Sequence, residues 1–359
     1  MSPSQMKKKK GIFSLALTNL LILVGLLLSV NLLSSLIMDG IYLYKQINPP
    51  VSQILYPESL PDQEYAQTIF QELRLLTKRY IPYVEWGRLP FSGRTITVDD
   101  TGERVQPLLP VNPTKHVHFF GGSTMWGTGV DDKNTMPSLF NQLHPDYRVY
   151  NHAQSGFISR QELAGLINQA NQSQPMDIVV FYDGCNDPLT LCRADVSING
   201  HREQSKFIAK LERDWETPDA LFGSTQTLVQ KIIKKGKRPN SQCQDNPAYA
   251  EKVAMTLVNN WKLAKQIANF RGAEFLAILQ PVASLGKPRI QYITEEFDGS
   301  DWATVYPLVL DIKTREQLDW IHDFTEIFNV KDFVYIDSCH VNMIGNQMVA
   351  EAIDRILQP

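Results

Sequence analysis

From about residue 116 to the end of the chain, short apolar runs alternate with longer segments of helical periodicity. The apolar runs hold four to six residues each, a length typical of buried strands. They are His116–Phe120, Tyr147–Tyr150, Asp177–Tyr182, Glu274–Leu279 and Phe333–Ile336. The helical segments are Thr135–Leu143, Ser159–Gln172, Tyr249–Arg271, Val305–Phe328 and Ile344–Leu357. This alternation predicts an α/β fold with a parallel sheet that helices cover on both faces.

Two other stretches lack this alternation. Residues 40–110 begin with prolines typical of a stalk, at Pro49, Pro50, Pro57 and Pro61. A helical pattern follows at Gln63–Lys78, and then a hairpin of Thr95–Val98 with Glu103–Val105. Residues 190–245 are charged and polar. We therefore expect a stalk and packing segment at 39–110, and one domain at 111–359 with a cap insertion at about 190–245.

The first forty residues differ from the rest of the chain. The four lysines Lys7–Lys10 precede 28 uncharged residues, Gly11–Met38, which are rich in leucine. About 20 apolar residues cross a hydrocarbon core of roughly 30 Å. A cleaved signal peptide, the alternative, would have a shorter apolar region and a small-x-small cleavage site, which Leu33–Asp39 does not offer. The sequence predicts a basic tail at 1–10 and a transmembrane signal anchor at 11–38.

The lysines favour a cytoplasmic N-terminus, which leaves the predicted domain outside the cytoplasm. Disulfides are permitted there, and the four cysteines allow three pairings. Cys192 and Cys243 bracket the polar insertion, so we favour a bridge between them, with four reduced thiols as the alternative. The sequence has no CxxC pair, and neither a zinc site nor a redox motif is indicated.

The composition excludes several classes of protein. The 359 residues are 43% hydrophobic and 20% charged, which rules out intrinsic disorder and a small disulfide scaffold. A polytopic transporter would be far more apolar. The chain has 35 basic against 38 acidic residues, and four of the lysines lie in the N-terminal tail. The predicted domain is therefore acidic, and we expect no nucleic-acid partner.

Polar and glycine-containing segments follow four of the predicted strands. They are Gly121–Gly127, Asn151–Gly156, Asp183–Asp187 and Asp337–His340. Because ligands bind at the carboxyl ends of the strands in doubly wound sheets, these segments should meet at one edge. A serine, a glycine, an asparagine and an Asp-x-x-His thus recur there in chain order.

This order resembles the SGNH (GDSL-type) hydrolase superfamily over roughly residues 115–357, as a membrane-anchored member. The resemblance implies a flavodoxin-like three-layer α/β/α fold, with Ser123 as nucleophile and Asp337 and His340 completing a triad. It also implies an oxyanion hole made by Ser123, Gly156 and Asn186. One departure is Gly122, which occupies the position of the acidic residue in the family's Gly-Asp-Ser block.

The chemistry supports the same assignment. A serine hydroxyl is a poor nucleophile until a base takes its proton, and a carboxylate must hold that base in the right tautomer. Asp337 and His340, three residues apart in a loop, can form such a pair. An oxyanion needs preorganised donors, and the Ser123 and Gly156 N–H groups with the Asn186 amide can supply them. Glycine at 156 allows the backbone to approach the substrate closely.

Other interpretations of these residues are open. Taken singly, Ser123 or Asp337 could cap a helix, and Asn186 could be a turn residue. An α/β-hydrolase would need Gly-x-Ser-x-Gly, which Gly121–Met125 lacks at its last position. A dinucleotide-binding site would need a third glycine where Asp132 stands.

Three histidines call for separate interpretation. His116 and His118 share one face of a predicted strand, but no third ligand lies at metal spacing, so we expect packing and no metal site. His152 follows the second predicted strand, close to the proposed site, and is a candidate substrate contact with packing as the alternative. No metal or organic cofactor is expected.

The sequence therefore predicts an extracytoplasmic serine esterase that cleaves an acyl ester through an acyl-enzyme. Its topology makes acylated cell-surface glycans or lipids plausible substrates, and the N-terminal helix makes the membrane a partner. An O-acyltransferase of exported polysaccharide, and a non-catalytic glycan-binding assembly protein, are the alternatives. The acyl group, the acceptor and the oligomeric state are left open by the sequence.

Overall fold

The computed structural model describes residues 3–47, 59–172, 174–211, 219–233, 240–293 and 297–358. The chain forms two compact units, which are described separately. One comprises residues 1–51 and 206–238, and the other residues 52–205 and 239–359. Three of the predicted stalk prolines, Pro49, Pro50 and Pro57, lie outside the described residues. The proposed boundaries at 39, 111, 190 and 245 stay predictions.

The larger unit is built on a five-stranded sheet with the order β6-β5-β7-β8-β9, in which every neighbouring pair is parallel. The strands are β5 (Lys115–Gly121), β6 (Tyr147–Asn151), β7 (Ile178–Asp183), β8 (Glu274–Leu279) and β9 (Ile321–Asp323). Counted along the chain this order is 2-1-3-4-5, the flavodoxin-like arrangement. The strand order reverses between β5 and β7, so a crevice is expected at their carboxyl ends.

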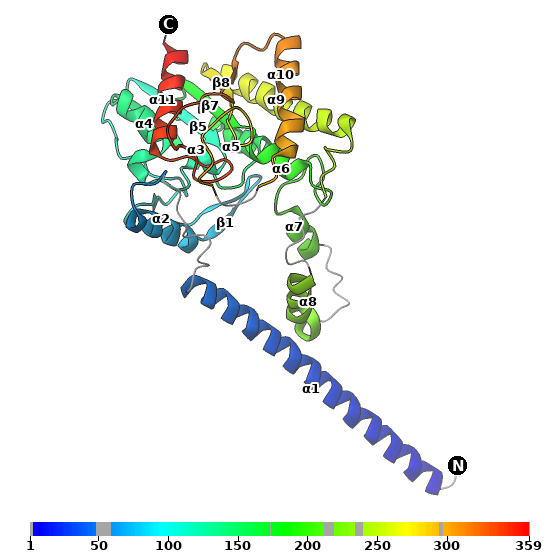
Figure 1. Ribbon diagram of the computed structural model, residues 1–359. Coiled ribbons are helices and arrows are strands. Elements are labelled where there is room, and N and C mark those ends of the chain that lie inside the picture. The colour runs from blue at the N-terminus through cyan, green and yellow to red at the C-terminus, as the bar shows by residue number, and fades with distance from the viewer. Residues whose placement is uncertain are drawn as a thin grey trace. The chain divides into compact units, whose positions relative to one another are not determined.

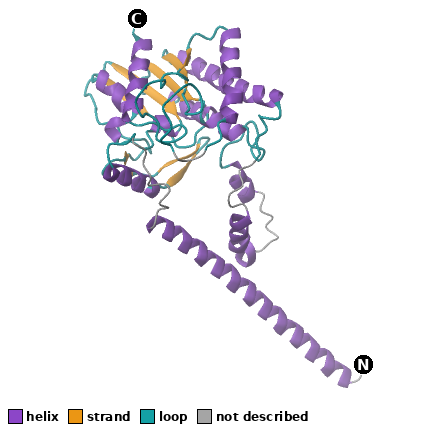
Figure 2. Cartoon of the chain, viewed as in Figure 1, coloured by secondary structure: helices purple, strands orange, loops and turns teal. Residues whose placement is uncertain are grey.

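Helices cover both faces of this sheet (Figures 1 and 2). The helices of this unit that follow β5 are α3 (Ser123–Trp126), α4 (Met136–Leu143), α5 (Ser159–Ala170), α6 (Asn186–Leu191), α9 (Pro247–Phe270), α10 (Ser300–Arg315) and α11 (Met343–Leu357). A short 3₁₀ turn at Asp132–Asn134 precedes α4. Alternate residues of β5 point to opposite faces: Phe119 packs in the core under α4 and α11, and Phe120 in the core under α5, α9 and α10. The predicted three-layer α/β/α fold is confirmed.

Local signals set the helix starts. The Thr135 side chain accepts the N–H of Ser138 at 3.2 Å before α4, and the Asn342 side chain accepts the N–H of Gly345 at 3.1 Å before α11. Such caps satisfy backbone donors that have no partner in the first helical turn. The α11 cap lies two residues after His340, so it also fixes where the loop carrying that histidine ends.

The prediction for the last strand is wrong. The fifth strand is β9, which pairs with Ala277–Leu279, and α10 ends at Arg315 rather than running to Phe328. Phe333–Ile336 instead bonds to the segment just after it, through a bridge between Tyr335 and Val341. Because β9 has three residues, its pairing with β8 rather than a local pattern defines it.

The segment before the sheet packs onto the same unit. Its elements are α2 (Gln63–Leu75), β1 (Lys78–Ile81), β2 (Glu85–Arg88), β3 (Phe91–Ser92) and β4 (Thr97–Val98). The expected hairpin is present, because Val98 bridges Arg104, and β4 also pairs with β3. The Arg104 guanidinium is buried, donates to the carbonyls of Gly127 and Val130 at 2.5 and 2.6 Å, and pairs with Asp132 at 2.9 Å. It thus joins this segment to the turn that follows α3.

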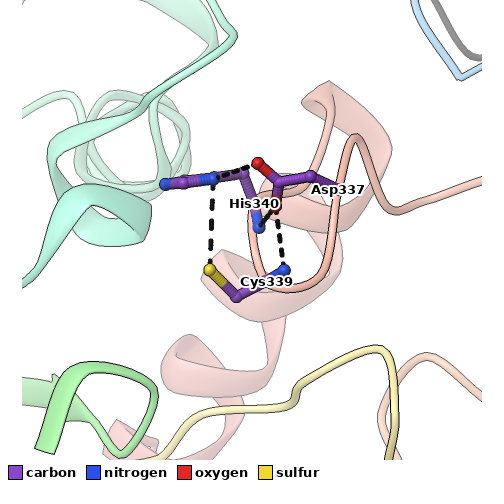
Figure 3. Close-up of side chains that lie close together, drawn as sticks. All are labelled: Asp337, Cys339 and His340. Carbon is purple, nitrogen blue, oxygen red and sulfur yellow. Dashed lines mark hydrogen bonds and ion pairs between the residues drawn. The ribbon is translucent and has the colours of Figure 1, made fainter. Parts of the chain in front are cut away.

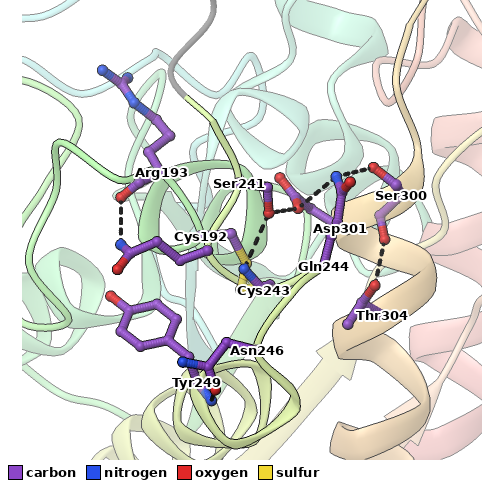
Figure 4. The surroundings of a disulfide bond; sticks show 11 residues. Cys192, Arg193, Ser241, Cys243, Gln244, Asn246, Tyr249, Ser300, Asp301 and Thr304 are labelled. Carbon is purple, nitrogen blue, oxygen red and sulfur yellow. Dashed lines mark hydrogen bonds between the residues drawn. A yellow bond between two sulfur atoms is a disulfide. The ribbon is translucent and has the colours of Figure 1, made fainter.

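A disulfide joins Cys192 to Cys243, as the sequence favours (Figure 4). The bridge links residues 51 positions apart across the polar insertion. Ser241 beside it donates to Asp301 of α10 at 2.5 Å, which ties the returning chain to the main unit. Cys185 and Cys339 are buried free thiols.

The smaller unit contains α1 (Pro3–Ile47) and α8 (Asp219–Ile233); a further helix of the insertion, α7, spans Gln204–Leu211. In α1, Phe13–Ile41 is long and apolar enough to cross a membrane, with a mean hydropathy of 2.5. The Asn31 side chain of α1 accepts the N–H groups of Ser224 and Thr225 in α8 at 2.8 and 3.1 Å. Polar contacts of this kind join helices in apolar surroundings. Part of the insertion therefore packs on the apolar N-terminal helix.

Candidate active site

The structure brings Ser123, His340 and Asp337 together. Ser123 begins α3 directly after β5, and its Oγ lies 2.7 Å from His340 Nε2. His340 Nδ1 lies 2.6 Å from Asp337 Oδ2. The carboxylate can only accept, so Nδ1 carries the proton and Nε2 is left to accept the proton of the serine hydroxyl. This is the tautomer that a histidine base requires.

The backbone of the loop between β9 and α11 holds Asp337 and His340 in place. Ile336 N–H donates to the His340 carbonyl at 2.8 Å, which closes the loop on itself. Asp337 Oδ1 accepts the N–H groups of Cys339 and His340 at 2.9 and 2.8 Å. One carboxylate oxygen therefore orders the loop while the other orients the imidazole.

The charges of Asp337 and His340 shift the pKa of both groups. Burial by itself would raise the pKa of Asp337, but the neighbouring His340 and the hydrogen bonds to the carboxylate hold it at about 2. Burial by itself would lower the pKa of His340, yet the Asp337 charge raises it well above its usual value. Each group thus stabilises the charged form of the other.

Asp337, Cys339 and His340 place three donor atoms within 4.8 Å of one another, a grouping that could also hold a metal ion (Figure 3). The hydrogen bond between Asp337 and His340 already occupies two of these donors. A hydrogen bond with Cys185 and burial raise the pKa of Cys339, so its thiol is neutral near pH 7. The arrangement fits a carboxylate–imidazole pair with a packed thiol beside it.

Two backbone donors and one side-chain amide are available for an oxyanion. Among the described residues, neither the N–H of Ser123 nor that of Gly156 donates a hydrogen bond to a protein acceptor. Asn186 Nδ2 donates to the Phe157 carbonyl at 2.8 Å, which orients the amide and leaves its second N–H open. Gly156 has φ +81°, a conformation that favours glycine.

The departure at Gly122 has a steric reason in this chain. A Cβ at this position would lie 2.3 Å from Asn186 Nδ2. A side chain there would displace the amide from its hydrogen bond with Phe157. Glycine at 122 therefore lets Asn186 approach the start of α3.

Three buried carboxyl groups adjoin the third block, and sequence reasoning did not identify them as a cluster. Asp187 accepts the Oγ and N–H of Ser159 at 2.6 and 3.1 Å. Burial raises the pKa of Asp187 to about 7 and that of Asp183 to about 6. Burial, with the charges of these neighbours, raises the pKa of Glu162 well above its usual value. Since Glu162 lies in α5, no local motif links it to the other two.

His116 and His118 are packing residues, as expected. His118 is buried and stacks on Tyr150, and burial lowers its pKa to about 3. Its Nδ1 lies 2.8 Å from His152 Nε2, and His152 Nδ1 lies 2.5 Å from Glu103 Oε1. Both nitrogens of His152 are therefore engaged within the protein. A substrate contact by His152 stays a prediction.

No family model matches the chain, and no curated protein matches it in sequence. Solved structures do resemble it. One is a member of the lipolytic protein G-D-S-L family from Veillonella parvula, at 14% identity and a TM-score of 0.39, covering 68% of this chain and 98% of that one. The extracellular lipase of Streptomyces rimosus has 13% identity and a TM-score of 0.38, covering 67% and 99%. A carbohydrate acetylesterase from Sinorhizobium meliloti has 11% identity and a TM-score of 0.34, covering 68% and 98%.

Because these identities and TM-scores are low, the fold is assigned from the strand order and the site from the distances above. The parallel sheet of order 2-1-3-4-5 lies between two helical layers. The segments after β5, β6 and β7 contribute Ser123, Gly156 and Asn186, and the loop between β9 and α11 contributes the Asp337–His340 pair. In its fold the chain resembles the SGNH (GDSL-type) hydrolases, as its sequence predicts.

Proposed function

We propose that this chain is a membrane-anchored serine esterase that hydrolyses an acyl ester outside the cytoplasm. The observation that carries the proposal is the hydrogen-bonded series of Ser123, His340 and Asp337, with distances of 2.7 and 2.6 Å. A serine hydroxyl bonded to a histidine that a carboxylate orients is the arrangement that activates serine for acyl transfer.

In this mechanism His340 Nε2 takes the proton of Ser123 as Oγ attacks the ester carbonyl. The tetrahedral oxyanion would be stabilised by the N–H groups of Ser123 and Gly156 and by the amide of Asn186. His340 then gives its proton to the leaving alcohol, and an acyl-enzyme forms. Water, deprotonated by the same histidine, releases the acid and restores Ser123.

The apolar helix α1 supports the proposed location. Its apolar stretch Phe13–Ile41 and the preceding lysines support a retained anchor with a cytoplasmic N-terminus. Acyl esters of cell-surface glycans or lipids are then within reach. A reporter fused to the C-terminus tests the orientation: we expect a periplasm-active or secreted-active reporter to work, and activity of a cytoplasm-only reporter would contradict it.

A fluorophosphonate probe tests the chemistry, because it reacts with activated serines. We expect the full-length protein in detergent to be labelled, and labelling to be lost in Ser123→Ala and in His340→Ala. Ser197→Ala, at an exposed serine far from the triad in sequence, is the matched control and should label like the wild type. Correctly folded wild type without labelling or activity on p-nitrophenyl acetate would refute the esterase proposal.

A further inference from the structure

A cavity lies in the larger unit, and none of the three triad residues lines it. It has a volume of about 400 Å³, within the usual range for small-ligand sites. Its walls come from the β1–β2 hairpin, the loop at 101–103, the segment after β6 and the C-terminal half of α5. We call it the hairpin cavity. Its hairpin and 101–103 walls precede residue 115, so they lie outside the part of the chain that resembles the SGNH hydrolases.

One wall residue, Gln154, has a buried acceptor without a partner. Gln154 is 5% exposed, and its Nε2 donates to the Gly102 carbonyl at 2.9 Å. Among the described residues, none donates a hydrogen bond to its Oε1, which is buried. Leaving such a buried atom without a hydrogen bond destabilises the folded protein. A ligand that donates a hydrogen bond to Oε1 would remove this destabilisation.

The cavity is lined by one cationic and one anionic side chain, Arg79 and Glu103. Arg79 donates to the carbonyls of Asp100, at 3.1 Å, and Thr101. Glu103 Oε1 contacts His152 at 2.5 Å and accepts from Gln169 at 3.4 Å. Among the described residues Arg79 Nε has no hydrogen-bond partner, and the opposite charges of Arg79 and Glu103 leave no excess charge in the lining to attract a charged ligand.

The lining is apolar in part, through Ile81, Pro82, Val84 and Phe157, and three of its other side chains can hydrogen-bond to a sugar. The side-chain amides of Gln154, Asn168 and Gln172 each carry a donor and an acceptor, as a hydroxyl group does. Trp86 also lines the cavity; it is 4% exposed, its indole N–H donates to the Ser155 carbonyl at 3.3 Å, and the Lys78 ammonium lies over its ring at 4.5 Å. An acyl chain has no donor and would leave Gln154 Oε1 unsatisfied.

The same short segment serves the cavity and the proposed active site. Gln154 and Phe157 line the cavity, and Gly156 lies between them in sequence. The Phe157 carbonyl also accepts from Asn186. A sugar bound here would contact the segment that carries one of the proposed oxyanion donors.

We propose that the hairpin cavity binds a neutral sugar unit of the acylated glycan whose ester Ser123 attacks. This inference rests on the proposed esterase function for the identity of the substrate. It does not require turnover to be tested, because binding can be measured in the Ser123→Ala protein.

The test is saturation-transfer NMR on full-length Ser123→Ala protein in detergent micelles. The probes are O-acetylated xylo-, manno- and gluco-tetrasaccharides. We expect transfer to the sugar ring protons of at least one, and Gln154→Leu should weaken its affinity at least ten-fold. Asn168→Ala, at a half-buried helix position, should weaken it at least three-fold and covers the case in which Gln154→Leu does not fold. Gln142→Leu, at an exposed glutamine of α4, is the control and should leave the affinity unchanged.

The outcomes separate the two proposals. No transfer to any of the three probes, with p-nitrophenyl acetate still hydrolysed by the wild type, would overturn the sugar site alone. Sugar binding without any Ser123-dependent turnover would overturn the esterase alone. Tighter binding of p-nitrophenyl octanoate in Gln154→Leu, with no sugar binding, would assign the cavity to an acyl chain and overturn the proposal.

Discussion

At the scale of single residues, His340 determines how the proposed reaction depends on pH. Its Nε2 can take the proton of Ser123 only while the imidazole is neutral. Asp337 raises the pKa of His340, so the neutral form appears only above the usual range of histidine. Asp337 therefore both orients His340 and raises the pH at which His340 becomes a neutral base.

We expect kcat/KM for p-nitrophenyl acetate to rise with pH through a midpoint above about 6.5, the ordinary histidine value. Asp337→Asn removes the charge that stabilises the imidazolium, so the midpoint should move to lower pH and the rate should fall about 10³- to 10⁴-fold. Rate profiles from pH 5 to 9 measure both effects. A midpoint that does not move in Asp337→Asn would contradict the electrostatic account.

Asn186 allows a second test at this scale. Its amide is oriented by the Phe157 carbonyl, so the open N–H is available without rearrangement. Asn186→Ala should lower kcat by about 10²- to 10³-fold, the usual effect of removing one oxyanion donor. Asn171→Ala, at the exposed end of α5, is the control. A loss of less than three-fold would argue against an oxyanion role for Asn186.

At the scale of elements, the segment before the sheet is more than a stalk. Its helix α2 holds the loop between β3 and β4 through Glu72, whose carboxylate accepts the N–H groups of Thr95 and Ile96 at 3.0 Å each. Arg104 belongs to the second hairpin, formed by Thr95–Val98 with Glu103–Val105. It joins this hairpin to the turn after α3, which is close in sequence to Ser123. The segment therefore supports both the hairpin cavity and the first block of the site.

We expect Arg104→Met to lower the free energy of unfolding of the larger unit by about 3–5 kcal/mol, because it leaves Asp132 and two carbonyls without their buried partner. Arg160→Met, at an exposed position of α5, should change it by less than about 0.5 kcal/mol. Urea unfolding followed by tryptophan fluorescence measures both. Equal effects of the two substitutions would contradict the role assigned to Arg104.

The elements also differ in how far the sequence predicts them. β7 and β8 were predicted within one residue because each is a continuous apolar run buried on both faces. The sequence does not predict β9 and predicts Phe333–Ile336 in its place, because both segments are short and only their pairing distinguishes them. The Asp-x-x-His loop still leads into α11, as the sequence predicts.

At the scale of the whole molecule, the buried carboxyls make stability depend on pH. The pKa of Asp187 is raised to about 7, so the folded protein keeps a proton that the unfolded chain loses near pH 4. The stabilisation of the protonated group is present below pH 4 and is lost as the pH rises through about 7. The pKa values of Asp183 and Glu162 are raised as well.

We expect the stability of Asp187→Asn relative to the wild type to increase between pH 5 and about 7, by up to about 1.4 kcal/mol per pH unit, and to level off above pH 7. The comparison removes the contributions of the histidines, which are common to both proteins. Asp311→Asn, at an exposed carboxylate of α10, should show no such trend. A difference between Asp187→Asn and wild type that stays constant with pH would show that Asp187 is ionised in the folded protein.

The sequence by itself determined the apolar N-terminal helix, the α/β class, the favoured disulfide and the polar blocks after the strands. These features depend on residues close together in the chain, where periodicity, charge and spacing are informative. Tertiary structure alone decided the identity of β9, the cluster of Glu162 with Asp183 and Asp187, and the hairpin cavity. Each of these requires segments far apart in sequence to pack against one another, and local sequence patterns do not indicate which distant segments do so.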